Sequence, residues 1–244
     1  MIFFFKKSTV NIDCFTHNEI VFNNFRPDRA NKFVPKEWKD LESSFSVRAN
    51  RDPNSLLTVD VNTLKKCNGI TELFSNGFII PNWADFQIEM KSNGSYNVAN
   101  LSPEEPNTTF NQHSREQYGN EFYKDCGHIK INSPWFLKES TGIKFAWNSC
   151  SWHNTNNLQN FYILPGVIDF KLQSGTHVNA FQKNNTITKW YAGDPLVQLM
   201  PLSDKKIKLT YHFLDLNSIN KIINRERTAL RYNNGRNLKA KCPF

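Results

Sequence analysis

The stretch ILPGVIDFKLQSGTHVNAFQKNNTITKWYAGDPLVQLMP, residues 163–201, decides the fold class of this chain. Short runs of apolar or alternating residues are separated there by turn residues, which is typical of an all-β core. The predicted strands cover 167–172, 176–181, 186–191 and 196–200. Because the polar turn at 183–185 is short, we expect the two strands that flank it to form a hairpin.

The residues before this stretch predict short strands and little helix. We expect a strand over 1–14 that turns and returns at 20–22. The run Pro-Lys-Glu at 35–37 can open a short helix. Residues 43–62 are polar and contain a proline, so they predict a loop. Apolar residues at helical spacing follow over 61–73, although an Asn-Gly pair interrupts them.

The remaining segments complete a β-rich pattern. A clean alternation over 85–90 and a Ser-Asn-Gly turn predict a hairpin with 96–101. Residues 102–126 are polar and turn-rich, which indicates a long surface loop of the kind that often carries function. A last strand over 207–214 and an amphipathic helix over 217–231 follow.

Together these patterns predict a mainly β protein of jelly-roll or β-clip type. A chain of 244 residues suits one large β domain or one domain with an arm. We divide it into an N-terminal elaboration packed on the core (1–84), a β core (85–214), and a C-terminal helix with a basic tail (215–244).

The amino-acid composition limits the classes of protein to which this chain can belong. Hydrophobic residues make up 39% of the chain, which is enough for a packed core. The formal net charge of +8 indicates either a solvated basic face or contact with a polyanion such as nucleic acid. No stretch approaches the roughly 20 apolar residues of a membrane span, so no membrane partner is expected. The apolar run at the N-terminus is too short for a signal peptide, and its lysine pair follows the run.

Cysteine and histidine patterns predict no metal site. The five cysteines are scattered and never form a CxxC pair, so we expect neither a zinc site nor a disulfide, and a reducing compartment fits best. No HxH or HExxH pair exists among the six histidines. An iron site on a jelly roll would need two histidines and a carboxylate. The set that could be assembled for it is His113, Glu116, His153 and His177, but each histidine reads more simply as a surface or loop residue.

Tryptophans suggest a second kind of site. Trp135, Trp152 and Trp190 are candidates for an aromatic surface that stacks on bases or sugars. The simpler interpretation is that they pack in the core or at a subunit interface.

Residues 142–201 resemble the second half of the trimeric dUTP pyrophosphatases and dCTP deaminases. The shared features are a Gly-Val-Ile-Asp turn at 166–169, a Gly-Asp-x-x-x-Gln-Leu turn and strand at 193–199, and a strand that leads into a loop at 148–151. The resemblance implies a β-clip core that forms trimers. It also implies that Asp169 activates water with Mg²⁺, and that Asn148, Ser149 and Gln198 bind a nucleotide.

Departures from that family weaken the enzymatic reading. Leu172 stands where the family has an aromatic that stacks on the deoxyribose, and Asn148 stands where it has a phosphate-binding arginine. The segment 232–237 has one glycine where the family has a Gly-rich closing segment. A triphosphate needs several cations and backbone N–H groups around it. We therefore interpret Asp169 as a turn residue that accepts hydrogen bonds from backbone N–H groups. No cofactor is expected, unless Mg²⁺ serves a nucleotide site.

Segments spread over most of the chain resemble an uncharacterised protein family of large contractile-tailed marine phages, including those of cyanobacteria. The segments that carry this resemblance are IDCFT (12–16), FVPKEWKDL (33–41), CNGI (67–70), FSNGFIIPNWADF (74–86), INSPWF (131–136) and LPGVIDFK (164–171). It implies a virion or host-cytoplasm location and other phage proteins as partners. We expect a non-catalytic virion component that forms a homo-oligomer, with a trimer first. The alternatives are a dUTPase-like nucleotide hydrolase or deaminase, and a module that binds glycans or nucleic acid.

Overall fold

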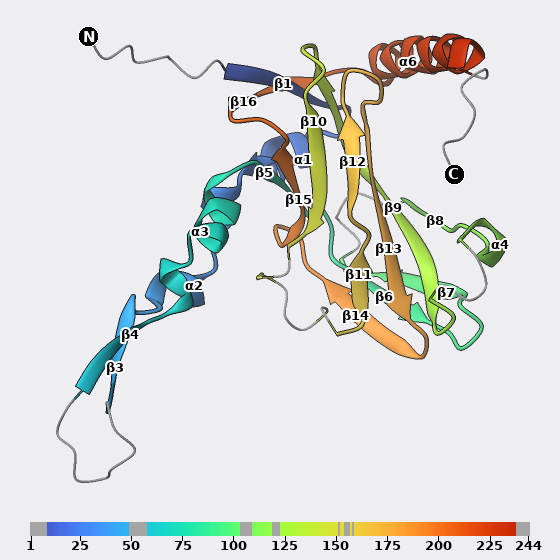
Figure 1. The fold of residues 1–244 in the computed structure, drawn as a ribbon. Helices are drawn as coiled ribbons and strands as arrows, with labels where there is room; N and C mark the ends of the chain where they lie inside the picture. The colour runs from blue at the N-terminus through green and yellow to red at the C-terminus, as the bar shows by residue number, and fades with distance from the viewer. Residues whose placement is uncertain are drawn as a thin grey trace, which may run out of the picture.

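The computed structural model describes residues 9–48, 58–102, 109–118, 123–150, 152–153, 157 and 159–237. Within these residues the chain is mainly β, with several sheets and a long C-terminal helix, as predicted (Figure 1). Three sheets contribute to one hydrophobic core, and a separate two-stranded hairpin lies on an arm that projects from this body.

The largest sheet supplies the floor of the site described below. Its strands are β1 (Thr9–Thr16), β8 (Thr109–Asn111), β9 (Cys126–Glu139), β11 (Phe161–Ile163), β13 (Gly175–Lys183) and β16 (Lys206–Phe213). Their order is β11-β13-β9-β1-β16, and β8 also pairs with β9. Strand β1 runs parallel to β16 and antiparallel to β9, so the N-terminal strand lies inside the sheet.

Two smaller sheets complete the body. One contains β2 (Asp28–Arg29), β5 (Phe78–Pro81), β10 (Lys144–Ser149), β12 (Gly166–Asp169) and β15 (Pro195–Pro201), in the order β12-β10-β15-β5-β2. The other contains β6 (Phe86–Met90), β7 (Tyr96–Asn100) and β14 (Thr186–Trp190), in the order β14-β6-β7. Alternate residues of these strands, among them Phe78, Phe86 and Phe145, enter the shared core.

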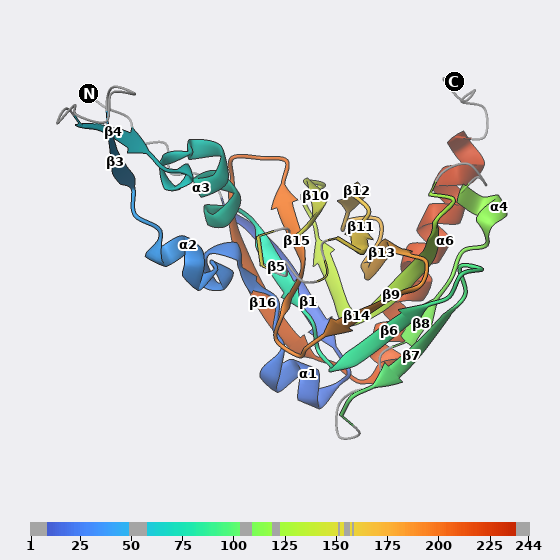
Figure 2. The same cartoon turned by 90° about the horizontal axis from the view of Figure 1, so that it is seen from below.

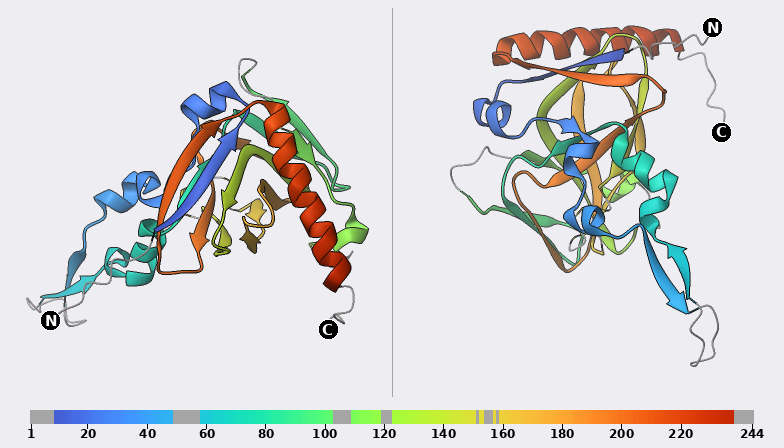
Figure 3. Two further views of the ribbon diagram at one scale, coloured as in Figure 1. Left: turned by 90° about the horizontal axis from the view of Figure 1, so that it is seen from above. Right: turned by 90° about the vertical axis from the view of Figure 1, so that its left-hand side faces the viewer.

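The arm is formed by α2 (Lys36–Asp40), β3 (Ser44–Arg48), β4 (Thr58–Asn62), the 3-10 helix η2 (Leu64–Lys66) and α3 (Asn68–Ser75). It extends away from the three sheets in every view (Figures 1 and 2). The remaining helices belong to the body: α1 (Glu19–Asn24), the 3-10 helix η1 (Ala30–Phe33), α4 (Arg115–Tyr118) and α6 (Leu216–Asn237). Helix α6 lies at the end of the molecule opposite to the tip of the arm (Figure 3).

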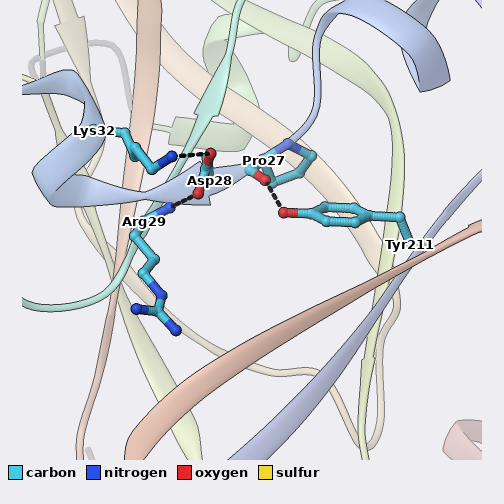
Figure 4. Close-up of polar contacts among 5 residues, drawn as sticks. All are labelled: Pro27, Asp28, Arg29, Lys32 and Tyr211. Atoms are coloured by element: carbon cyan, nitrogen blue, oxygen red, sulfur yellow. Dashed lines mark hydrogen bonds and ion pairs between the residues drawn. The ribbon is translucent and has the colours of Figure 1, made fainter.

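The root of the arm is fastened to the body through β2. The hydroxyl of Tyr211 on β16 donates to the carbonyl oxygen of Pro27 at 2.7 Å, as Figure 4 shows. Asp28 accepts the backbone N–H of Arg29 at 2.7 Å and forms an ion pair with Lys32 at 3.9 Å. Burial raises the pKa of Tyr211 to about 12, so its hydroxyl stays a donor at all ordinary pH values.

Helix α6 begins at a clear cap and is joined to the sheet by one buried carboxylate. Asp215 accepts the backbone N–H of Ser218 at 2.9 Å and its hydroxyl at 2.6 Å, as an N-cap does. One turn further on, Ile219 is fully buried. Glu226 accepts both the backbone N–H and the hydroxyl of Ser174. No described helix is long and apolar enough to cross a membrane.

Three local predictions are wrong. Residues 20–22 form part of helix α1 instead of a returning strand, because Asn18 caps the helix by accepting the N–H of Val21 at 3.0 Å. Residues predicted as a loop over 43–62 contain the hairpin β3–β4. The strands on either side of the 183–185 turn do not pair with each other: β13 pairs with β9 and β11, and β14 pairs with β6.

The predicted boundary at residue 84 does not separate an elaboration from the core. Strand β1 pairs with β9, and β5 pairs with β15, so both belong to the sheets of the body. The arm is the part of the N-terminal region that stands apart. Helix α6 begins at Leu216, next to the predicted division at 215, and residues 1–8 of the predicted first strand and residues 238–244 of the basic tail lie outside the described residues.

Glu139, which ends β9, organises the turn into β10 and gives a testable pH dependence. Its carboxylate accepts the backbone N–H groups of Thr141, Gly142 and Ile143 at 2.5, 2.7 and 3.1 Å. Burial raises the pKa of Glu139, but hydrogen bonds from Thr141, Gly142 and Ile143 outweigh it, so the pKa lies below its ordinary value of 4.5. The charged form is therefore the one that the fold stabilises.

We expect Glu139→Gln to lower the free energy of unfolding by about 1–3 kcal/mol near neutral pH, because an amide cannot accept all three N–H groups. A carboxylate with a lowered pKa stabilises the fold above its ordinary pKa and loses this effect as the pH falls through the lowered value. The difference in the free energy of unfolding between the unmodified chain and Glu139→Gln should thus become smaller below about pH 4.5. Urea unfolding from pH 7 to pH 3 measures it, with the exposed Glu89→Gln as control; a difference independent of pH contradicts this role.

Candidate functional site

The floor of the candidate site is the outer face of β9 and β13. Residues 128, 130 and 132 of β9 alternate with Ile129 and Ile131, which are fully buried in the core. The strand register pairs His128 with Phe181, Lys130 with Asn179, and Asn132 with His177. One face of this strand pair is therefore core, and the other presents histidine, lysine and amide side chains to a cavity.

Two walls flank this floor, and together they line an open cavity of about 670 Å³. On one side lie His113, Gln117 and Tyr118, from the segment that contains α4. On the other side lie Trp147 of β10 and residues 164–168, which lead into and form β12. Figure 2 shows α4 and β12 on opposite sides of β9 and β13.

His128 and His177 in the pocket are neutral at physiological pH. Burial, with a smaller effect of His113, lowers the pKa of His128 to about 4. Burial, with a smaller effect of Lys130, lowers the pKa of His177 to about 4. Nδ1 of His128 accepts the backbone N–H of His113 at 3.2 Å, so the proton of the neutral ring is on Nε2. The site thus combines one ammonium group with uncharged histidines that can each donate one hydrogen bond.

Asp169 does not meet the other residues of the dUTPase-like prediction in one copy of the chain. Asn148 and Gln198 are cross-strand partners, but the amide of Gln198 donates to the carbonyl oxygens of Leu73 and Asn76, at 2.6 and 3.2 Å. Asp169 lies opposite Lys144, four positions before Asn148 on β10, which corresponds to about 13 Å along the strand.

Asp169 itself behaves as a turn residue. Its Oδ1 accepts the backbone N–H of Lys171 at 2.9 Å. Its own carbonyl oxygen accepts the N–H groups of Leu172 and Gln173. Ser149 lies opposite Val197 on the neighbouring strand. The residues of the dUTPase-like prediction are thus distributed along β10, β12 and β15. The side-chain amide of Gln198 already donates to two carbonyl oxygens at the root of the arm.

Two of the three predicted surface tryptophans are buried, and that prediction is wrong for them. Trp135 is 0% and Trp190 is 4% exposed, so both are core residues, as the simpler interpretation had it. Trp152 is 38% exposed and packs against Trp38 and Phe74 of the arm, with ring centroids 5.5 and 6.2 Å apart. An aromatic cluster thus forms at the base of the arm instead of an exposed stacking platform.

The structure does not bring together the set predicted for an iron site, which was His113, Glu116, His153 and His177. His113 and His177 line the cavity, whereas His153 packs against Phe74, 6.0 Å between ring centroids. His128, which sequence reasoning left out, lies between them on the floor. The alternation His-Ile-Lys-Ile-Asn at 128–132 is the signal that could have identified it. Among the described residues, no group of three or more histidine, cysteine or acidic side chains could hold a metal ion.

The arm carries a second candidate surface. On its hairpin, Phe45 pairs with Val61 and Val47 with Val59, which puts four apolar side chains on one face. The other face is polar, with a hydrogen bond of 2.6 Å from Ser46 to Asp60. Phe45 and Val59 are 50% and 51% exposed. The apolar face continues into a groove of about 610 Å³ that Leu41 and Leu64 also line.

No protein-family model matches the chain, and no curated protein is similar to it.

Proposed function

We propose that this chain is a non-catalytic structural or assembly component of a phage particle, and that it forms a homo-oligomer, with a trimer first, through its arm. The observation that carries the proposal is the uncovered apolar face of the hairpin β3–β4. The phage context rests on the sequence resemblance, and the trimer rests on the similarity to β-clip proteins. Other phage proteins would be its further partners in the virion or the host cytoplasm.

The pattern of the hairpin indicates that a partner covers it. An isolated two-stranded hairpin is at best marginally stable in water, and an alternating apolar face is typical of a ribbon that is buried on one side. The arm extends away from its own sheets, so the described body of the same chain does not cover this face (Figure 1). A neighbouring copy can do so.

A second copy offers apolar side chains for the arm to meet. Phe213 and Leu216 are exposed at the junction of β16 and α6, at the end of the molecule opposite to the tip of the arm. An arm that binds this region of the next copy makes a head-to-tail contact, and such contacts generate closed rings when the rotation closes. Three copies form a small ring of this kind.

The two alternatives receive different support. A nucleotide hydrolase would need Asp169 close to Asn148, and within one chain they lie apart on the ladder of β10 and β12. A binding module for glycans or nucleic acid is favoured by one observation, the basic pocket on β9 and β13, and by the net charge of +8. The jelly-roll or β-clip assignment stays part of the proposal.

Phe45→Asp tests the assembly role. Replacing a phenylalanine that the neighbouring copy would bury by an aspartate weakens each interface by about 1.5–3 kcal/mol, or roughly 10- to 100-fold in its dissociation constant. We expect the unmodified chain to have the mass of a trimer by light scattering at micromolar concentration, and Phe45→Asp to be mainly monomeric.

Thr58→Asp is the matched control, because it adds the same charge to the polar face of the same hairpin. It should leave the trimer unchanged. A monomeric unmodified chain, or a Phe45→Asp chain that still forms trimers, contradicts the proposal. Release of pyrophosphate from dUTP or dCTP with Mg²⁺ that Asp169→Asn abolishes would favour the hydrolase instead.

A further inference from the structure

We propose that the pocket on β9 and β13 binds a small organic anion whose ring lies against the aromatic walls of the cavity. This site lies on the body and is independent of the arm and of assembly. A cavity of about 670 Å³ is large enough for one or two rings with an attached charged group.

The charge of the lining has one sign. Lys130 projects from the floor, and none of the described lining residues is a carboxylate. The ion pairs of the described residues do not involve Lys130 either. A partly buried ammonium group without a counter-charge attracts an anion more strongly than an exposed one does, because less water screens it.

Uncharged donors stand beside this ammonium group. His128 carries its proton on Nε2, since its Nδ1 already accepts a backbone N–H, and its side chain also interacts with the side chain of Asn179. Nδ1 of His177 is buried and has no hydrogen-bond partner among the described residues. Neutral donors next to a lysine suit the oxygens of a carboxylate or a phosphate, which accept several hydrogen bonds at once.

The walls suit a ring. Trp147, which is 6% exposed, and Tyr118 line the cavity from its two walls, and Phe181 lies on the floor beside His128. Aromatic side chains bind sugar and base rings through their faces. The amides of Asn179 and Gln173 line the same cavity and can bind hydroxyl or carbonyl groups. An acidic sugar and a nucleoside monophosphate share this chemistry: an anionic group attached to a ring.

Calorimetry with the full chain tests the site with two matched pairs of ligands: glucuronate against glucose, and uridine monophosphate against uridine. We expect at least one anionic member to bind about 10-fold or more tightly than its neutral partner, because only it reaches the ammonium of Lys130. Binding of glucuronate alone identifies a sugar acid as the ligand class, and binding of the monophosphate alone identifies a nucleotide.

Lys130→Met should weaken that binding roughly 10-fold or more, because it removes the charge and keeps most of the aliphatic side chain. Lys138→Met, an exposed lysine on the same strand outside the pocket, is the control and should change nothing. If Lys130→Met does not fold, His177→Gln replaces it, with the same expected loss.

Binding should also take up protons. The titratable groups that face the cavity are His128 and Lys130 from β9, His177 from β13, and His113 and Tyr118 from the segment with α4. An anion beside His128 and His177 raises their pKa values from about 4, so affinity should rise as the pH falls from 7 to 5.

Equal affinity for the charged and neutral members of both pairs, or equal losses in Lys130→Met and Lys138→Met, overturns the proposal. Phe45→Asp should bind the ligand normally, which separates this site from the assembly role.

Discussion

Gly77→Ala is expected to lower the free energy of unfolding by about 2–5 kcal/mol, from about 1–2 for the left-handed backbone and about 1–3 for the clash. Gly77 has φ +75°, and a Cβ added to it would lie 2.1 Å from the carbonyl oxygen of Leu199. That oxygen belongs to the backbone of β15, which pairs with β5. A clash with backbone cannot be relieved by a side-chain rotation, so β5 would have to move away from β15.

Gly69→Ala provides the matched control. Gly69 lies in α3, and a Cβ added there meets no atom within 4 Å. Alanine is favoured over glycine in a helix by about 1 kcal/mol, so this variant should be as stable as the unmodified chain or more so. Urea unfolding of the three chains measures the effect. A Gly77→Ala chain that unfolds at the same midpoint as the unmodified chain contradicts the tight approach of β5 to β15.

Trp135→Ala is expected to lower the free energy of unfolding by about 3–5 kcal/mol, the usual range for replacing a fully buried large aromatic residue by alanine. Trp135 is 0% exposed, and its indole N–H donates to the carbonyl oxygen of Phe25 at 2.8 Å. Trp135→Phe should keep most of the packing but leave that carbonyl without its donor, at a cost of about 1–3 kcal/mol.

The same change at Trp152 is the comparison, because Trp152 is 38% exposed. Its contacts with Trp38 and Phe74 lie at the base of the arm, so Trp152→Ala should have a smaller effect on the unfolding of the body. Thermal and urea unfolding distinguish the two sites. Equal losses for Trp135→Ala and Trp152→Ala would contradict the assignment of Trp135 to the core.

The sequence predicted elements well and their partners poorly. The strands of residues 163–201 appear close to their predicted positions because the alternation of side chains is a local property. The hairpin over the 183–185 turn does not form, because β14 pairs with β6, a strand about a hundred positions earlier. Pairing between distant strands depends on which apolar faces share a core, and a local pattern carries no information about it.

The prediction for the hairpin of the arm was wrong because it relied on the polar composition of the segment. Residues 43–62 were expected to be a loop, and yet 44–48 and 58–62 alternate as strands do. The alternation there is short, and residues 49–57 separate its two halves. Asn18, similarly, turned an apolar run into helix α1 through one cap bond.

The candidate site could be predicted only in part. His113 and His177 were noted, but the pairing of β9 with β13 in their observed register is what adds His128 and Lys130 to them. A pocket of this kind arises from two strands and two loops that are distant in the sequence. The fold has to be known before the residues can be grouped.

The insertion that carries the arm begins and ends at neighbouring points of the same sheet. The chain leaves the sheet at Arg29 and re-enters it at Phe78, and these two residues are cross-strand partners. Two residues are enough to join antiparallel partners in a hairpin. An ancestral chain could therefore have lacked residues 30–77 and kept the sheet of β2, β5 and β15 continuous. Evolution can lengthen, shorten or exchange such an insertion while the strand order of the body stays the same, so the arm and the pocket on β9 and β13 can diverge independently among related chains.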